Sequence, residues 1–251
     1  MNEIIDINDP RIKEFVSIRD HVLNKNNLIV VEAEKLFLQF KAAQKTIYKL
    51  LATKAFLERH NLVGDNYFYA DKNVLDSVAG FKLEYEVLFL AEKPNDTALE
   101  KLDDRIILLN GLSSPENVGA IVRSSAAFGI KTIITDEKTC SPFLRRCIRV
   151  SMGNIFSMKT YHSKDIRSDL TQLKALGYTI LSTANLSHSV NLAEFSFPEK
   201  CILIIGSEGH GVDQDILDSS DSILKIKIDP QVAHLNASNA AAIFLSHMSL
   251  I

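Results

Sequence analysis

The feature that most constrains this chain is a regular alternation of short apolar runs and helical segments after residue 105. The apolar runs are Ile106–Leu109, Thr132–Thr135, Tyr178–Ser182, Cys201–Ile205 and Ile223–Ile228. The helical patterns are Val118–Phe128, Ile166–Leu176 and Asn236–Met248, and glycines follow the first two. Strands separated by helices pair in parallel and form a sheet covered on both faces. The sequence therefore predicts an α/β fold with a parallel sheet for residues 105–251.

Residues 1–92 also alternate strand-like and helical patterns. The strand-like runs are Leu28–Val31, Ile47–Ala52 and Val87–Leu90, and a helical pattern lies near Glu34–Gln44. The turn-forming segment Lys93–Thr97 then breaks the pattern. We therefore predict a smaller α/β domain at residues 1–92, a linker at 93–104 and a second domain at 105–251.

Composition narrows the class of protein. Hydrophobic residues make up 46% of the chain, and the longest apolar runs are too short to span a membrane. The cysteines Cys140, Cys147 and Cys201 form no C-x-x-C pair, so neither a disulfide framework nor a metal site is predicted. We expect a soluble cytoplasmic protein. Because the net charge is −3, any nucleic-acid-binding surface must be a local basic patch and not a property of the whole chain.

Three loops follow predicted strands, and ligands of parallel sheets bind beyond the carboxyl ends of the strands. The first runs from Asn110 into a helix rich in small residues, where Asn117 can act as the helix cap and Arg123 as a solvated charge. The third runs from Ile226 to Ile243 and contains His234 and Asn236. Capping and close helix packing would also account for these two segments.

The second loop, Gly206–Gly211, has three glycines within six residues and carries Glu208. Glycines there let a ligand approach the backbone closely. A dinucleotide fingerprint reads G-x-G-x-x-G after the first strand, whereas this loop reads G-x-x-G-x-G late in the chain. No G-K-[ST] phosphate loop is present either. A nucleotide-dependent oxidoreductase is therefore disfavoured.

Together, in this order and spacing, the three loops resemble the motifs of the SpoU (TrmH) family of RNA 2′-O-methyltransferases in the SPOUT superfamily. Ser151–Phe156 resembles the small-residue segment of that family, and Val31–Lys35 is similar, more weakly, to its substrate-binding domain. The resemblance implies a C-terminal methyltransferase domain with a trefoil knot, preceded by an RNA substrate-binding domain. It also implies S-adenosylmethionine as the cofactor, rRNA or tRNA as the substrate, and a homodimer through the C-terminal domain.

The resemblance also assigns roles to residues. Asn117, Arg123, Glu208 and Asn236 correspond to the catalytic set, and Gly206, Ile226 and Leu235 to the cofactor site. The third loop departs from the family pattern, because Lys227 replaces a proline, Asp229–Gln231 replaces a glycine-rich turn, and His234 replaces a serine. The changed loop motivates an alternative function, a non-catalytic RNA-binding protein that retains the methyltransferase fold.

Methyl transfer to a hydroxyl needs an acceptor for its proton and no metal. The resemblance assigns that acceptor to Arg123, but deprotonating a free arginine at pH 7 costs about 8 kcal/mol. Arg123 can instead hold a phosphate and the developing alkoxide. Three interpretations of His234 stay open: contact with phosphate or substrate, a structural role, or proton acceptor, since a neutral imidazole can take a proton.

Two basic clusters are candidate RNA contacts. Between Arg11 and Arg59 ten basic residues stand against five acidic ones, and Lys41 and Lys45 have the i, i+4 spacing of a helical ridge. A solvated helix face is the alternative for this ridge. The second cluster is Arg145, Arg146 and Arg149.

Overall fold

The computed structural model describes residues 2–80, 82 and 86–249. Contacts divide it into two compact units: unit 1 contains the chain up to Pro94 together with Phe143–Arg149, and unit 2 contains Asn95–Pro142 and the chain from Val150 onward. The segment Phe143–Arg149 therefore packs with unit 1 although unit 2 precedes and follows it in sequence. No helix within the described ranges is long and apolar enough to cross a membrane.

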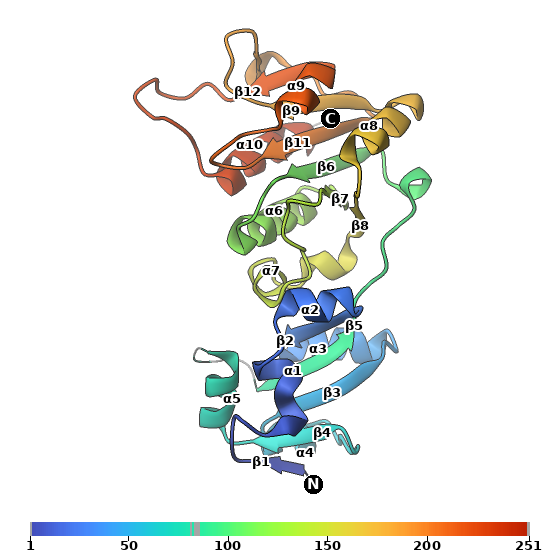
Figure 1. The fold of residues 1–251 in the computed structure, drawn as a ribbon, viewed down its shortest axis with the longest axis vertical. Coiled ribbons are helices and arrows are strands. Elements are labelled where there is room, and N and C mark those ends of the chain that lie inside the picture. Colours follow the sequence, from blue (N-terminus) through green and yellow to red (C-terminus); the bar gives the residue numbers. More distant parts are fainter. Residues whose placement is uncertain (1, 81, 83–85, 250–251) are drawn as a thin grey trace. The chain divides into compact units, whose positions relative to one another are not determined.

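Unit 1 is built on a five-stranded mixed sheet with the order β1-β4-β3-β5-β2 (Figure 1). Its strands are β1 (Asn2–Ile4), β2 (Leu28–Glu32), β3 (Ile47–Ala52), β4 (Tyr67–Ala70) and β5 (Val87–Glu92). Its helices are α1 (Lys13–Val16), α2 (Asp20–Lys25), α3 (Glu34–Ala42), α4 (Lys54–Arg59), α5 (Lys72–Ala79) and most of α7 (Arg145–Val150). Strand β5 pairs antiparallel with β2 and β3, whereas β4 pairs parallel with β1 and β3.

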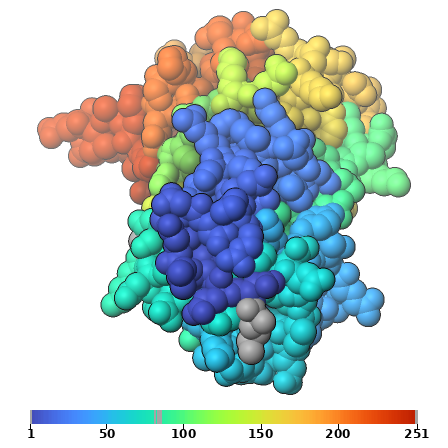
Figure 2. All heavy atoms as spheres, turned by 60° about the horizontal axis from the view of Figure 1, so that its bottom comes forward, coloured from blue at the N-terminus to red at the C-terminus, as the bar shows by residue number. Residues whose placement is uncertain are grey.

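Each face of this sheet has its own core. On one face Phe15 of α1, Leu23 of α2 and Leu75 of α5 pack on alternate strand residues such as Leu51 and Leu88. On the other face, edge-to-face contacts join Phe89 of β5 to Phe37 and Phe40 of α3. In Figure 2 the blue N-terminal residues lie against cyan residues, as the pairing of β1 with β4 requires.

Unit 2 contains a seven-stranded sheet with the order β10-β12-β9-β11-β6-β7-β8, in which every pair is parallel (Figure 1). Its strands are β6 (Arg105–Asn110), β7 (Thr132–Thr135), β8 (Lys159–His162), β9 (Thr179–Thr183), β10 (Val190–Asn191), β11 (Cys201–Gly206) and β12 (Ser222–Lys225). Its helices are α6 (Pro115–Ala127), α8 (Ile166–Ala175), α9 (Gln214–Ser219) and α10 (Ala237–Ser249). The predicted parallel α/β fold is confirmed.

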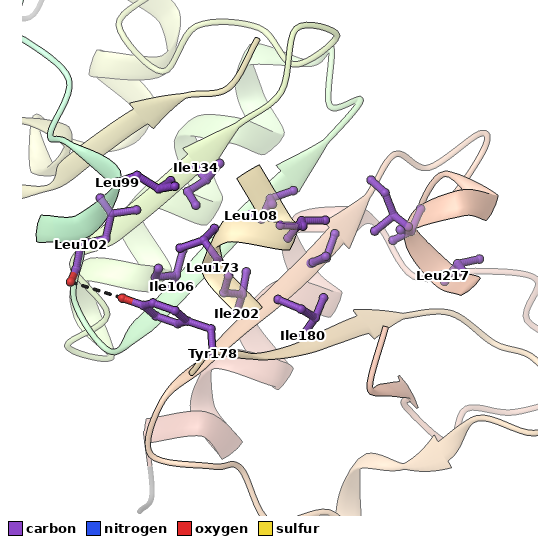
Figure 3. Close-up of a cluster of buried hydrophobic side chains, with 14 residues drawn as sticks. Leu99, Leu102, Ile106, Leu108, Ile134, Leu173, Tyr178, Ile180, Ile202 and Leu217 are labelled. Atoms are coloured by element: carbon purple, nitrogen blue, oxygen red, sulfur yellow. Dashed lines mark hydrogen bonds between the residues drawn. The ribbon is translucent and has the colours of Figure 1, made fainter. Parts of the chain in front are cut away.

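Helices cover both faces of the sheet in unit 2. Leu173 of α8 and Ile216 of α9 join the buried cluster formed by Ile106, Ile202 and their neighbours, drawn in Figure 3. The hydroxyl of Tyr178 donates to the Leu102 carbonyl oxygen at 3.4 Å at the edge of this cluster (Figure 3). Strand residues of the opposite parity point to the other face. Helices α6 and α10 pack against each other, and α10 also contacts β11.

Two predicted elements have different bounds in the structure. The run Ile223–Ile228 was predicted as one strand, but β12 ends at Lys225, and the residues after it form a long loop that projects from unit 2 (orange-red, Figures 1 and 2). The helix predicted from Val118 begins at Pro115. The trefoil knot and the linker at 93–104 stay predictions.

Candidate active site

The first two loops start side by side. Strands β6 and β11 are neighbours, and their register pairs Asn110 with Gly206 at the ends of the two strands. Because both strands run in the same direction, both loops leave the sheet at its carboxyl edge. Two residues 96 positions apart in sequence are thereby brought to one place, as the predicted site requires.

The start of α6 leaves the Asn117 side chain available for contacts outside the helix. The Ser114 hydroxyl accepts a hydrogen bond from the Asn117 backbone N–H at 3.4 Å, and Pro115 occupies the first turn. The interpretation of Asn117 as the helix cap is therefore wrong, because Ser114 is the cap. Asn117 itself is buried, with 9% of its surface exposed.

The glycine loop is a closed turn that carries Glu208. Ser207 and Gly211 exchange two backbone hydrogen bonds of 3.1 and 2.9 Å. A Cβ atom on Gly206 would lie 2.1 Å from the carbonyl carbon of Gly211, so a side chain at this position would clash with the returning backbone. The glycine at 206 is therefore required by the turn itself, and the turn presents Glu208 at the surface.

Asn117, Glu208 and Asn236 form one hydrogen-bonded cluster. The Asn117 amide donates to Glu208 Oε1 at 2.8 Å, and the Asn236 amide donates to the same oxygen and, at 3.0 Å, to Asn117 Oδ1. The Ala237 backbone N–H also donates to Glu208 Oε1, at 3.3 Å. One carboxylate oxygen thus joins the first residues of α10 to the glycine loop and to α6.

Asn236 has a second function in this cluster. Its Oδ1 accepts from the backbone N–H groups of Ser238 at 2.9 Å and Asn239 at 3.3 Å, which caps α10. The interpretation of Asn236 as a cap is confirmed, but it is incomplete. Because the cap fixes Oδ1, the amide nitrogen of Asn236 has to point toward Glu208 and Asn117.

A cavity of about 370 Å³ lies beside the cluster. Gly206, Ile226 and Leu235, the three residues predicted for the cofactor, all line it, as do Ile205 and Phe244. The glycine loop and the loop after β12 therefore surround a single pocket, as expected from the sequence.

A second cavity, of about 280 Å³, adjoins the first at the glycine loop. Residues Gly111–Ser114 and Asn117 line it, and it shares Glu208 and His210 with the first cavity. No described residue donates to Glu208 Oε2, whereas Oε1 accepts three donors in the cluster. Glu208 thus lines both cavities and has one carboxylate oxygen that no described residue binds.

Two predicted catalytic residues lie outside the cluster. Arg123 is exposed on α6, lines neither cavity, and makes no hydrogen bond or ion pair with the residues that the structure describes. His234 is exposed in the loop after β12 and lines the first cavity, not the second. His234 is thus not part of a packed core, and its role stays a prediction.

The predicted RNA contacts lie in unit 1. The predicted helical ridge of Lys41 and Lys45 is wrong, because α3 ends at Ala42 and Lys45 follows it. Both side chains are exposed, and Lys45 lies over the Phe40 ring. In α7, Arg149 binds Glu32 at 3.2 Å and Arg145 is 3.7 Å from the same carboxylate. Arg146 of that helix is exposed.

The sequence-based prediction missed part of the first cavity. Thr183, the last residue of β9, and the next two residues, Ala184 and Asn185, line it. The position of this segment after a predicted parallel strand is the signal that could have identified it. Among the described residues no group of three or more His, Cys, Asp or Glu side chains is arranged to hold a metal ion.

Comparison with known proteins identifies relatives across the chain. Residues 104–246 match the model of the SpoU rRNA Methylase family. An uncharacterized tRNA/rRNA methyltransferase of Mycobacterium bovis is 25% identical over 97% of this chain and 90% of its own length. The 23S rRNA (guanosine(2553)-2′-O)-methyltransferase RlmP of Bacillus subtilis is 28% identical over 57% of each chain.

Solved structures share the fold. An rRNA methyltransferase from Sinorhizobium meliloti, with AdoMet bound, superposes with a TM-score of 0.86 at 19% identity, over 98% of this chain and 97% of its own. The similarity extends over the elements of both units.

Proposed function

We propose that this chain, which belongs to the SpoU rRNA Methylase family, transfers a methyl group from S-adenosylmethionine to a ribose 2′-hydroxyl of rRNA or tRNA. The observation that carries the proposal is the convergence of Asn117, Glu208 and Asn236 beside two adjoining cavities. The ribose hydroxyl as acceptor is supported by the similarity to a relative named as a 2′-O-methyltransferase.

The first cavity fits the cofactor. Its volume of about 370 Å³ suits a small-molecule site, and its lining combines apolar side chains such as Ile226 and Leu235 with polar Thr183 and Asn185. The backbone of the glycine loop forms one wall, so a ligand can approach main-chain groups there. When bound, S-adenosylmethionine supplies an electrophilic methyl group on a sulfonium.

The second cavity would hold the acceptor nucleotide. Asn117 and Asn236 hold Glu208 Oε1, which leaves Oε2 to accept a hydrogen bond from the ribose hydroxyl. A fixed acceptor orients the hydroxyl oxygen toward the first cavity, and correct orientation is a large part of the rate gain in such transfers. The proposed role of Asn117 and Asn236 is to orient Glu208.

Arg123 lines neither cavity and makes no hydrogen bond with Asn117, Glu208 or Asn236, so we do not assign it to the site of its own chain. We infer a homodimer through the C-terminal domain in which Arg123 of one copy completes the site of the other, as a cation that binds a phosphate or the developing alkoxide. The exposure of Arg123 and its lack of an intramolecular partner among the described residues support this arrangement.

Complementation tests the shared site. Arg123→Ala and Glu208→Gln homodimers should each lose methyl transfer, and unfolding and re-mixing them should restore a fraction of the parental rate, because one site in each mixed dimer is then intact. Activity of Arg123→Ala equal to that of the parent would remove Arg123 from the site, and a monomer in solution would exclude the arrangement.

His234 lines the first cavity, and two of the roles predicted for it can be separated by kinetics: contact with substrate phosphate and acceptance of the hydroxyl proton. If it contacts substrate phosphate, His234→Ser should raise KM for RNA and leave kcat nearly unchanged. If it accepts the hydroxyl proton, the same variant should lower kcat by about 10²-fold. A His234→Ser protein with parental kcat and KM would exclude both roles.

Two measurements test the function as a whole. Calorimetry should show S-adenosylmethionine binding and no NAD binding, and 2′-O-methyl mapping of total RNA from cells with and without the protein should identify the modified nucleotide. RNA would contact Lys41 and Lys45, and release of α7 from Glu32 would add Arg145, Arg146 and Arg149. We expect the methylation to take place in the cytoplasm. RNA binding without cofactor binding would favour the non-catalytic alternative.

A further inference from the structure

Asp136 is a buried carboxylate that the proposed chemistry does not use. It directly follows β7, only 4% of its surface is exposed, and it lines neither cavity. Strand β7 lies beside β6, which in turn lies beside β11 (Figure 1). Because Asp136 directly follows β7, it is at the carboxyl edge from which both active-site loops leave.

Asp136 holds the start of the first loop. Its Oδ2 accepts from the Asn110 amide at 2.7 Å and from the Gly111 backbone N–H at 3.0 Å. Its Oδ1 accepts from the backbone N–H and the hydroxyl of Thr139 at 2.8 and 2.6 Å. The Thr139 hydroxyl oxygen in turn accepts from the Leu112 N–H at 3.1 Å. The turn that leads to Ser114 and Asn117 is therefore fixed at two consecutive backbone amides.

The same carboxylate reaches the end of the glycine loop through Asn110. Asn110 Oδ1 accepts from the Asp213 backbone N–H at 2.8 Å, and the Asn110 amide also donates to the Asp213 carboxylate at 3.2 Å. Asp213 follows Gly211, which closes the Glu208 turn, by two residues. The orientation of the Asn110 amide is fixed because its nitrogen must face Asp136.

We propose that Asp136 is a positioning residue that sets the distance between the Asn117 and Glu208 loops and so the shape of the second cavity. The proposal rests on the proposed function for its activity readout. A carboxylate is needed because donors approach both of its oxygens, whereas an asparagine would present an N–H₂ group to donors in either orientation. Asp136→Asn keeps the shape of the side chain and removes this match.

Kinetics separates positioning from a general structural role. The first cavity is lined by the ends of β9, β11 and β12, by the loops after them and by α10. It shares residues 207–210 and Ala237 with the second cavity, but residues 111–117 do not line it. Asp136→Asn should therefore lower kcat/KM for RNA by roughly 10²-fold, as expected for reacting groups misplaced by about 1 Å. Its Kd for S-adenosylmethionine should change far less, by about threefold at most, because the link through Asn110 to Asp213 acts on the glycine loop alone among the walls of the first cavity. A fall in cofactor affinity parallel to the loss of rate would overturn the positioning role, as would a parental rate.

The matched control is Asp169→Asn. Asp169 is also buried, with 7% of its surface exposed, and accepts a hydrogen bond from the Ser163 hydroxyl, but it lines neither cavity. This variant should leave kcat/KM and cofactor affinity unchanged. If Asp136→Asn does not fold, Thr139→Val decides: it retains the carboxylate and removes one hydroxyl, and it should lower kcat/KM for RNA by a smaller factor, again with cofactor affinity unchanged.

Hydrogen exchange gives a readout independent of activity. Asp136→Asn should speed exchange at residues 110–117 and also at 207–213, whereas a purely local role would affect only residues near 111 and 139. Exchange unchanged at 207–213 would overturn the proposal. If the parent protein methylates no RNA, the proposed function fails, and the exchange result still decides whether Asp136 joins the two loops.

Discussion

Two buried carboxylates, Asp136 in unit 2 and Glu32 in unit 1, are held in different ways. Asp136 accepts hydrogen bonds from four groups within 3.0 Å, all of them neutral backbone or side-chain donors. Glu32, with 7% of its surface exposed, faces two guanidinium groups at 3.2 and 3.7 Å. Its Oε1 and the nearby Arg145 Nε both lack a hydrogen-bond partner in the described structure.

Asp136 is stabilised by well-placed hydrogen bonds, whereas Glu32 depends on the attraction of opposite charges. Burial raises the pKa of the Glu32 carboxyl, and the charges of Arg145 and Arg149, which lower it, do not fully compensate. Opposite charges alone therefore do not make a buried site favourable, since removing them from water costs more than a long contact returns. We infer that Asp136 fixes its surroundings, whereas Glu32 holds α7 in unit 1 by a weaker attachment.

The largest expected effect is that of Asp136→Ala. Its removal leaves several buried donors without acceptors at about 1–3 kcal/mol each, so unit 2 should lose roughly 3–5 kcal/mol of unfolding free energy. Glu32→Ala should cost unit 1 less, roughly 1–2 kcal/mol, because Arg145 keeps its contact with Asp20. Native-state hydrogen exchange at buried amides of β6 and of β2 measures the two units separately. An equal or larger loss for Glu32→Ala would break the comparison.

This contrast also shows what the sequence could and could not predict. The strands β6, β7 and β11 follow directly from apolar runs, because a strand buried on both faces needs apolar side chains at nearly every position. The third-loop residues Ile226 and Ile228 are apolar for another reason: they line a cavity. A run of apolar residues does not distinguish the two environments, so β12 was predicted too long.

The burial and the partners of polar residues were harder to predict from the sequence. Asp136 begins an Asp-Glu-Lys-Thr segment that has the composition of a solvated turn, and its burial depends on donors from residue 110 onward. Glu32 likewise depends on a distant partner, since Arg149 lies 117 positions away in sequence. Asn117, Glu208 and Asn236 were found because their motif is recognisable, but their shared hydrogen bonds at Glu208 Oε1 could be established only in three dimensions.

A smaller effect is expected for Glu32→Gln, with a defined pH dependence. Below the ordinary value of 4.5 the carboxyl is protonated in both folded and unfolded chains, so parent and variant should have nearly equal stability. As the pH rises through the raised pKa of the folded state, the parent should lose stability relative to the variant, by up to about 1 kcal/mol. Exchange rates at β2 amides from pH 4 to 8 test this. A parent that gains stability over that interval would show that the arginines outweigh burial.

A still smaller change should follow from Lys138→Met, and its pH dependence has the opposite sign. Lys138 binds the Asp213 carboxylate at 2.8 Å and lowers the pKa of that group below its ordinary value of 3.8. The stabilisation is present above pH 3.8 and is lost as the pH falls through the lowered pKa. Solvent screens this exposed pair. At neutral pH the loss of stability in Lys138→Met should therefore be smaller than the loss in Asp136→Ala or in Glu32→Ala. A loss that persists at pH 2 would not arise from the ion pair.

The smallest effect concerns a third buried acid, the Cys201 thiol, which is neutral at physiological pH. Burial raises its pKa to about 11 and outweighs the attraction of Arg105. Unlike Glu32, the thiol keeps its proton in both folded and unfolded chains from pH 6 to about 7.5, so its burial adds no pH dependence to the stability of unit 2 there. Nearer its ordinary pKa of 9.0 the unfolded thiol ionises first, and stability should fall. Because the thiolate is the reactive form, iodoacetamide at pH 8 should leave Cys201 and the buried Cys147 unmodified while it labels the partly exposed Cys140. Cys140→Ser serves as the control and should abolish labelling of the native protein. Labelling of Cys201 at the rate of an exposed thiol would show that unit 2 opens at β11. The inference that Asp136 fixes its surroundings in unit 2 would then be wrong.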